Sequence, residues 1–147
     1  MGKSKRPRKA YRPRQASAGI AGRLQPWALD RVLAPLENML RHIRRGGELD
    51  VDESDTLIYA CSATGSHYDV IGLVQAFAET FAKQRQCDPK APAVDRLHEL
   101  IASINGDTVT EAMVDAGLAC VASIRAYMAA NPLGNIREAA LSVSRAA

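Results

Sequence analysis

Apolar side chains recur every three or four residues over long stretches of the chain, which is the period of an amphipathic α-helix. The first stripe ends at Gly46-Gly47 and contains Leu29, Val32, Leu33, Leu36, Leu40 and Ile43. Asp30 is its predicted start, and Pro35 interrupts it. Two alternatives follow: a short turn precedes a helix that begins near Pro35, or one helix is kinked there.

Residues 52–86 are predicted to be helical, either as one bent helix or as two in series. Asp52, Glu53 and Asp55 favour a helix N-terminus, and Leu57, Ile58 and Cys61 form the apolar side that follows. Gly65-Ser66 weakens the pattern, and Ser66 followed by Asp69 is suited to cap a new start. The stripe then resumes with Ile71, Val74, Phe77, Ala78 and Phe81.

Three further helices are predicted after the break at Asp88-Pro89-Lys90-Ala91-Pro92. Residues 94–104 form the first, which ends at Asn105-Gly106. The second begins with a capping box between Thr108 and Glu111 and runs to Asn131-Pro132. The third is short and carries Ile136, Ala140 and Val143. Because no convincing strand is found, the fold is predicted to be all-α, a compact bundle of four to five helices.

Charge divides the chain into two parts. The first 29 residues carry eight Lys/Arg and no acid, whereas the remaining 118 carry eleven basic and sixteen acidic residues. The N-terminal part has few apolar side chains to bury, so it does not offset the entropy of its own ordering. We therefore predict a disordered basic arm at residues 1–22 and a helical domain at 23–147.

The arm is the main candidate for binding nucleic acid. Its prolines keep the chain extended, so that flanking cations follow a phosphate backbone, and Tyr11 is placed to stack on an unpaired base. Arg41, Arg44 and Arg45, together with His42, extend this footprint onto the domain, or else they complement the C-terminal end of a helix dipole. A solubility tail and an arm for RNA or an acidic protein are the alternatives. The predicted arm residues are Lys3, Lys5, Arg6, Arg8, Lys9, Tyr11, Arg12 and Arg14.

Other chemistry is not predicted. Ser66, His67 and Asp69 bring together a hydroxyl, an imidazole and a carboxylate, but neighbours on a helix point in different directions, so capping is the preferred interpretation. The histidines and cysteines lack metal-ligand spacing, and no Gly-rich phosphate loop is present. We therefore predict no enzyme, no metal and no cofactor. Cys61, Cys87 and Cys120 are interpreted as free thiols that pack as small apolar side chains.

The segment Lys-Arg-Pro-Arg-Lys-Ala-Tyr-Arg-Pro-Arg at residues 5–14 resembles the start of small uncharacterised bacteriophage and prophage proteins. In that family a Lys/Arg-Lys-x-Tyr-Arg-Pro start precedes a helical body. The similarity continues through the helix that ends at Gly46 and the segment from Asp52. The family has no established activity, so the resemblance implies a phage setting and little more. The three widely spaced cysteines indicate free thiols in a reducing compartment, so the protein is predicted to be cytoplasmic in a bacterial host cell.

The leading hypothesis is a small phage-type accessory protein that binds DNA or RNA without sequence specificity. Its domain would supply a partner surface or form a homo-oligomer. One alternative is a protein that inhibits or redirects a host factor, such as a defence complex or a polymerase. Another is a structural or packaging component of a virion. No apolar run approaches the ~18 residues of a membrane span, so no membrane is expected.

Overall fold

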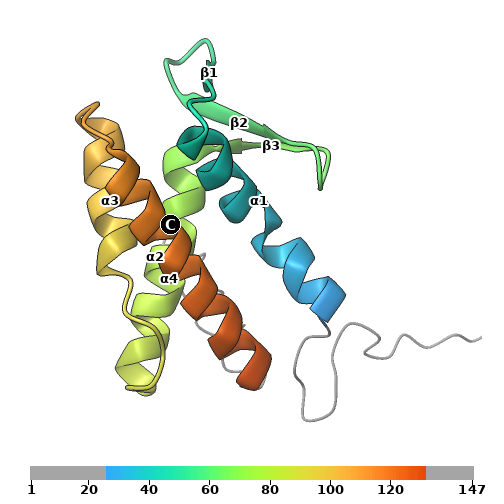
Figure 1. Ribbon diagram of the computed structural model, residues 1–147, viewed down its shortest axis with the longest axis vertical. Coiled ribbons are helices and arrows are strands. Elements are labelled where there is room, and N and C mark those ends of the chain that lie inside the picture. Colours follow the sequence, from blue (N-terminus) through green and yellow to red (C-terminus); the bar gives the residue numbers. More distant parts are fainter. Residues whose placement is uncertain (1–25, 132–147) are drawn as a thin grey trace, which may run out of the picture.

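The computed structural model describes residues 26–131, which form four helices and a three-stranded sheet around one core. The helices are α1 (Pro26–Arg44), α2 (Val70–Cys87), α3 (Asp95–Asn105) and α4 (Glu111–Ala130). The strands β1 (Asp50–Val51), β2 (Leu57–Cys61) and β3 (Ser66–Asp69) follow α1 and precede α2 in the chain, and they lie at one end of the helices (Figure 1). The predicted arm at 1–22, the boundary after residue 22 and the predicted helix with Ile136, Ala140 and Val143 lie outside the described residues.

The all-α prediction is wrong, because residues 50–69 form an antiparallel sheet in the order β1-β2-β3. In β2, Leu57 and Tyr59 pack against the core and Cys61 is buried. This is the two-residue period of a strand with one covered face. Five residues that are nearly all apolar fit this period and a helical one equally well, so the spacing alone did not separate them.

The acids at 52–55 form a turn and not the start of a helix. The Asp52 carboxylate accepts hydrogen bonds from the backbone N–H groups of Ser54 at 2.8 Å and Thr56 at 2.9 Å. Asp55 adopts a left-handed conformation with φ 62°. A carboxylate satisfies backbone amides in a turn as well as at a helix N-terminus, so the residue types fit both structures.

Helix α1 is one helix that contains Pro35, which rules out the alternative of a helix that begins near Pro35. Its described part begins at Pro26, so the predicted start at Asp30 is at least four positions too late. Proline is favoured in the first turn of a helix, where its missing N–H has no partner to lose. The predicted apolar stripe is confirmed at Leu29, Leu33, Leu36 and Leu40, which are buried.

Two of the predicted capping residues need correction. Asp69 caps α2 as predicted, because its carboxylate accepts a hydrogen bond from Gly72 N at 3.1 Å, but Ser66 lies in β3. The cap of α4 is Thr110, which accepts from Met113 N at 3.2 Å, and not Thr108. The helix therefore starts two residues later than the capping-box pattern predicted.

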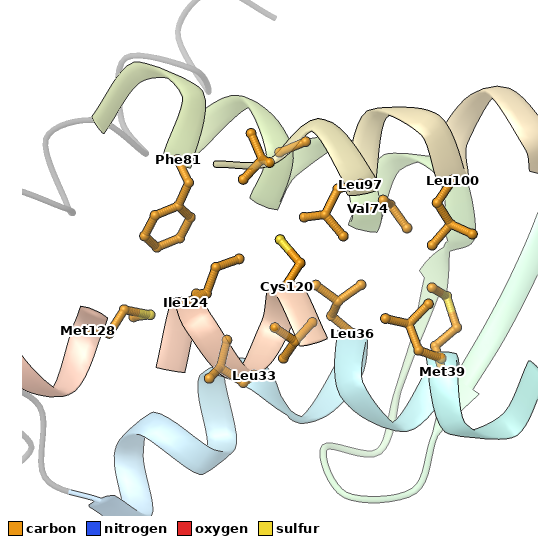
Figure 2. Packing of buried hydrophobic residues seen from close by; sticks show 14 of the residues in the cluster. Leu33, Leu36, Met39, Val74, Phe81, Leu97, Leu100, Cys120, Ile124 and Met128 are labelled. Atoms are coloured by element: carbon orange, nitrogen blue, oxygen red, sulfur yellow. The ribbon is translucent and has the colours of Figure 1, made fainter. Parts of the chain in front are cut away.

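The core is filled by side chains from all four helices. Figure 2 shows labelled members from each: Leu33, Leu36 and Met39 (α1), Val74 and Phe81 (α2), Leu97 and Leu100 (α3), and Cys120, Ile124 and Met128 (α4). Gly117 lets α4 approach closely, because a Cβ there would lie 3.3 Å from Leu100 Cδ2 and 3.5 Å from Leu40 Cδ1. Side chains of α1 and α3 thus meet the backbone of α4 at this glycine.

A polar network joins the C-terminal end of α2 to α4. Gln84 Nε2 donates to Tyr127 Oη at 2.8 Å, and Tyr127 Oη donates to Asp88 Oδ2 at 2.7 Å. The hydrogen bond from Tyr127, with the backbone N–H of Lys90, lowers the pKa of Asp88. Burial, followed by the hydrogen bond to Asp88, raises the pKa of Tyr127. The buried amide of Gln84 is therefore satisfied inside the bundle.

Candidate nucleic-acid interface

The predicted arm residues lie outside the described residues, so the candidate interface is built on α1, the helix that follows them. A helix turns by about 100° per residue, which places positions 31, 41 and 45 within roughly 40° of position 27 around the axis. Trp27, Arg31, Arg41 and Arg45 are all exposed. Arg45 directly follows the last residue of α1, Arg44, and its backbone N–H donates to the carbonyl oxygen of Arg41 at 3.1 Å, so the helical turn extends to it. These four residues are called the outer face of α1 below. They span about 27 Å along the helix.

Arg41 and Arg45 lie on the outer face, as the predicted extension of the arm requires. Arg41 forms a salt bridge with Glu37 at 3.5 Å, and its side chain stays 55% exposed. A surface pair of this kind is weak and leaves the guanidinium accessible to a phosphate. Arg45 has no ion pair with any residue between 26 and 131. Both cations are therefore open to solvent.

Arg44 lies on a different side of α1 and faces α4. Its Nε atom donates to Asp115 Oδ1 at 2.8 Å, and its Nη1 atom lies 3.4 Å from Glu111 Oε1. The hydrogen bond to Asp115 and the charges of both carboxylates raise the pKa of Arg44. Arg44 therefore differs from Arg41 and Arg45, because the charge of its guanidinium is already balanced by carboxylates of the domain.

Arg125 of α4 neutralises the carboxylates on the same side of α1. It forms ion pairs with Asp30 and, through Nη2, with Glu37 Oε1 at 3.1 Å. These are the only two acidic residues of α1. Both are held toward α4, so the outer face of α1 is bordered by carboxylates that already have a cationic partner.

His42 supports the loop after α1. Its Nε2 atom donates to the carbonyl oxygen of Glu48 at 2.7 Å, and its ring lies against that of Tyr59 with centroids 5.6 Å apart. A Cβ at Gly47 would lie 2.3 Å from the imidazole, so Gly47 makes room for the ring. Gly46 adopts φ 81°, with open space where a Cβ would be. His42 is therefore a structural residue of the turn.

A cavity of about 370 Å³ lies between the C-terminus of α1 and the N-terminus of α4. Its lining includes Ile43, Val109 and Val114, with Arg44, Arg45 and Glu111. The salt bridge between Arg44 and Glu111 balances two of these charges, which leaves Arg45 as the unbalanced one. The cavity adds a recess of mixed polar and apolar lining beside one end of the outer face.

The segment Ser66–Asp69 is a strand in which successive side chains alternate between the two faces of the sheet. His67 pairs with Ala60, and Tyr68 pairs with Tyr59 on the other face. Tyr68 Oη lies 3.0 Å from Thr64 Oγ1. The carboxylate of Asp69 is used in the cap of α2. The structure thus does not bring the hydroxyl, imidazole and carboxylate of this segment together as a set.

The three cysteines are free thiols in different surroundings. Cys61 and Cys120 are buried as predicted, whereas Cys87 is exposed at the end of α2 and the prediction is wrong for it. Burial raises the pKa of Cys120. Burial also acts to raise the pKa of Cys61, but hydrogen bonds from Thr64, Ala63 and Asn38 outweigh it and lower that pKa. No group of metal-ligating residues occurs within 26–131.

The described part of the chain is acidic apart from the outer face of α1. Residues 26–131 contain nine Lys/Arg and fifteen Asp/Glu, a formal charge of −6. Five of the acids lie in the exposed segment from Glu48 to Asp55. A polyanion is repelled by such a surface, so its contacts are restricted to regions where cations are unbalanced.

Comparison with known proteins found no match to a protein-family model, to a curated protein or to a solved structure.

Two residues of the outer face were not singled out from the sequence, namely Trp27 and Arg31. Trp27 is 60% exposed, the largest exposure among the large apolar side chains of residues 26–131. The sequence does contain a signal for them, because Trp27, Arg31, Arg41 and Arg45 repeat at helical spacing opposite the leucine stripe. This spacing can be recognised only when Trp27 is known to belong to the helix.

Proposed function

We propose that the protein is a small, phage-type accessory protein that binds nucleic acid through its basic N-terminal arm. The observation that carries the proposal is the sequence of the first fourteen residues, which contain seven Lys/Arg and no acid. Such a segment gains free energy by releasing the counterions of a phosphate backbone. The domain that follows the arm is acidic, so it repels a polyanion and does not add nonspecific attraction to that of the arm.

The outer face of α1 supports this proposal because it continues the arm. The last cation of the N-terminal segment, Arg23, precedes Trp27 by four positions, and Arg31, Arg41 and Arg45 follow on one side of the helix. A backbone that leaves the arm thus meets further cations along about 27 Å of α1. The contacts are with phosphates, so little sequence specificity is expected.

The test is a fluorescence-anisotropy titration of the full-length chain with labelled oligonucleotides at several salt concentrations. If all seven arm cations contact phosphate, log affinity falls linearly with log salt with a slope of magnitude up to about six on duplex DNA. Replacing Arg12 and Arg14 with Ala lowers that slope by roughly one to two. No binding at low salt would refute the proposal.

A second candidate, a protein that binds a host factor, is favoured by the surface of α4. Its exposed positions are mostly alanine, and α4 is long and apolar enough to match a membrane span, although core helices of soluble proteins meet the same criterion. Surface helices normally present polar residues. A pull-down with and without nuclease separates the candidates, because a nuclease-resistant partner that Ala122→Lys releases supports the second.

A further inference from the structure

The exposed indole of Trp27 points to the kind of nucleic acid that the protein binds, an inference that rests on the proposed function. We propose that the ligand is single-stranded and that one of its bases stacks on Trp27 while Arg31 contacts a neighbouring phosphate. Trp27 lies in the first turn of α1 and is 60% exposed. Aromatic rings at a charged surface are the common platform on which proteins stack unpaired bases.

The position of Arg31 matches this role. It lies one helical turn after Trp27, so the two side chains share the same side of α1. Arg31 is exposed and has no ion pair with any described residue. A guanidinium next to an aromatic ring supplies the two contacts that one nucleotide offers, a charged phosphate and the face of a base.

The nearby carboxylate does not oppose an anion. Asp30, between Trp27 and Arg31 in the chain, forms an ion pair with Arg125 of α4. Its charge is therefore balanced, and it is held on the side of α1 that faces α4. Since Arg125 also holds Glu37, no unpaired acid of α1 borders Trp27.

A single strand is favoured over a duplex because its base faces are accessible for stacking. In a duplex the faces are stacked on one another, and inserting a ring between them costs a few kcal/mol per step. In a single strand they are accessible, and stacking on an aromatic side chain adds affinity for every base type. The phosphate contacts of the arm and of α1 are available in both cases, so within residues 26–131 Trp27 is the residue that distinguishes single strands from duplex, in addition to the stacking predicted for Tyr11 of the arm.

The test uses the fact that Trp27 is the only tryptophan in the chain. Intrinsic fluorescence of the full-length protein is titrated with dT and rU oligonucleotides and with a duplex of equal length. We expect both single strands to quench Trp27, with saturation at the concentration at which anisotropy saturates. The duplex should bind with little quenching. Quenching by only one of the two single strands would identify DNA or RNA as the ligand.

Variants give a second measurement. Trp27→Ala should weaken single-strand binding by roughly 5- to 150-fold, which corresponds to the loss of one stacked base. Duplex affinity should change less than about twofold. Trp27→Phe keeps a ring and should recover part of the loss, and Val32→Ala is the matched control, because Val32 is exposed on another side of α1. Circular dichroism confirms that each variant is folded.

The outcomes separate this inference from the proposed function. If the protein binds single strands with the expected salt dependence but Trp27 is not quenched, or Trp27→Ala weakens single-strand and duplex binding equally, stacking is refuted and the proposed function stands. If no oligonucleotide binds at low salt, both are refuted. Quenching by single strands, together with selective loss in Trp27→Ala, supports the inference.

Discussion

The two sides of α1 use the same residue types for opposite purposes. On the side toward α4, arginines and carboxylates are matched: Arg44 with Asp115 and Glu111, and Arg125 with Asp30 and Glu37. On the outer face, Arg31 and Arg45 have no acidic partner among the described residues. The number of arginines on a helix thus says less about ligand binding than the number left unbalanced.

The largest effect is expected from removing the arm, which isolates what α1 contributes alone. A chain that starts at residue 23 should lose more than about a hundredfold in affinity for an oligonucleotide at low salt, because seven cations are removed. It should keep its helical circular dichroism and its cooperative thermal unfolding. If the truncated chain unfolds, the arm is part of the folded domain and the division of the chain at residue 22 is wrong.

Gly117→Val tests the packed side of α1 without touching the outer face. The side chain would overlap Leu100 and Leu40, so the free energy of unfolding should fall by about 1–3 kcal/mol. Urea unfolding followed by circular dichroism measures this loss. Oligonucleotide affinity, measured where both proteins are folded, should be unchanged. The matched control is Ala119→Val on the exposed side of α4, which should be tolerated.

Arg44→Ala and Arg45→Ala form a pair of neighbouring substitutions that compares the two sides directly. Arg45→Ala should lower the magnitude of the salt slope by about 0.9 on duplex DNA or about 0.7 on a single strand and leave stability unchanged, because one unbalanced cation is lost. Arg44→Ala should leave the slope nearly unchanged and slightly lower the melting temperature, since Asp115 and Glu111 lose their partner. Equal changes in slope for the two variants would contradict the assignment of Arg44 to the structural side.

The smallest effect concerns pH and the polar network of Gln84, Tyr127 and Asp88, which joins α2 to α4. Tyr127 has a raised pKa in the folded state, so its contribution to stability is complete below the unfolded value of about 10 and is lost as pH rises through the folded value. Asp88 has a lowered pKa, so its contribution is present above about 3.9 and is lost as pH falls. Tyr127→Phe should weaken the alkaline dependence in melting curves recorded against pH, and Tyr59, whose pKa is also raised by burial, should account for part of what remains. Oligonucleotide binding at neutral pH should be unchanged.

The helices were predictable from sequence where the apolar stripe is long. The apolar pattern identified α1, the second half of the segment 52–86, α3 and α4. Each of these has several helical turns with the same apolar period, so a single residue that departs from the pattern does not hide the helix. The sheet was not found, because β1 has two residues and β2 has five. Strands this short are stabilised mainly by their contacts with α1 and α2, and these contacts cannot be read from the residues of the strands themselves.

The candidate interface was predictable only in part. Charge identified Arg41, Arg44 and Arg45 together, but Arg44 points to a different side of the helix from Arg41 and Arg45, which are one turn apart. Which of them are balanced depends on residues about 70 positions away, such as Asp115, and these contacts exist only in the folded chain. The place of Trp27 depended on where α1 begins, and helix ends are the least certain feature of a sequence pattern.

Gly46 and Gly47 look like one glycine pair, but they would respond differently in a library of substitutions. Gly46 is required for its backbone conformation, so Asn, which tolerates left-handed φ, is the replacement most easily accepted. Gly47 is required for space, because any Cβ collides with the His42 ring. Position 47 therefore accepts a side chain only when position 42 becomes smaller, and the two positions should vary together. A selection that retains folded variants would show this as paired changes at 42 and 47 and independent change at 46.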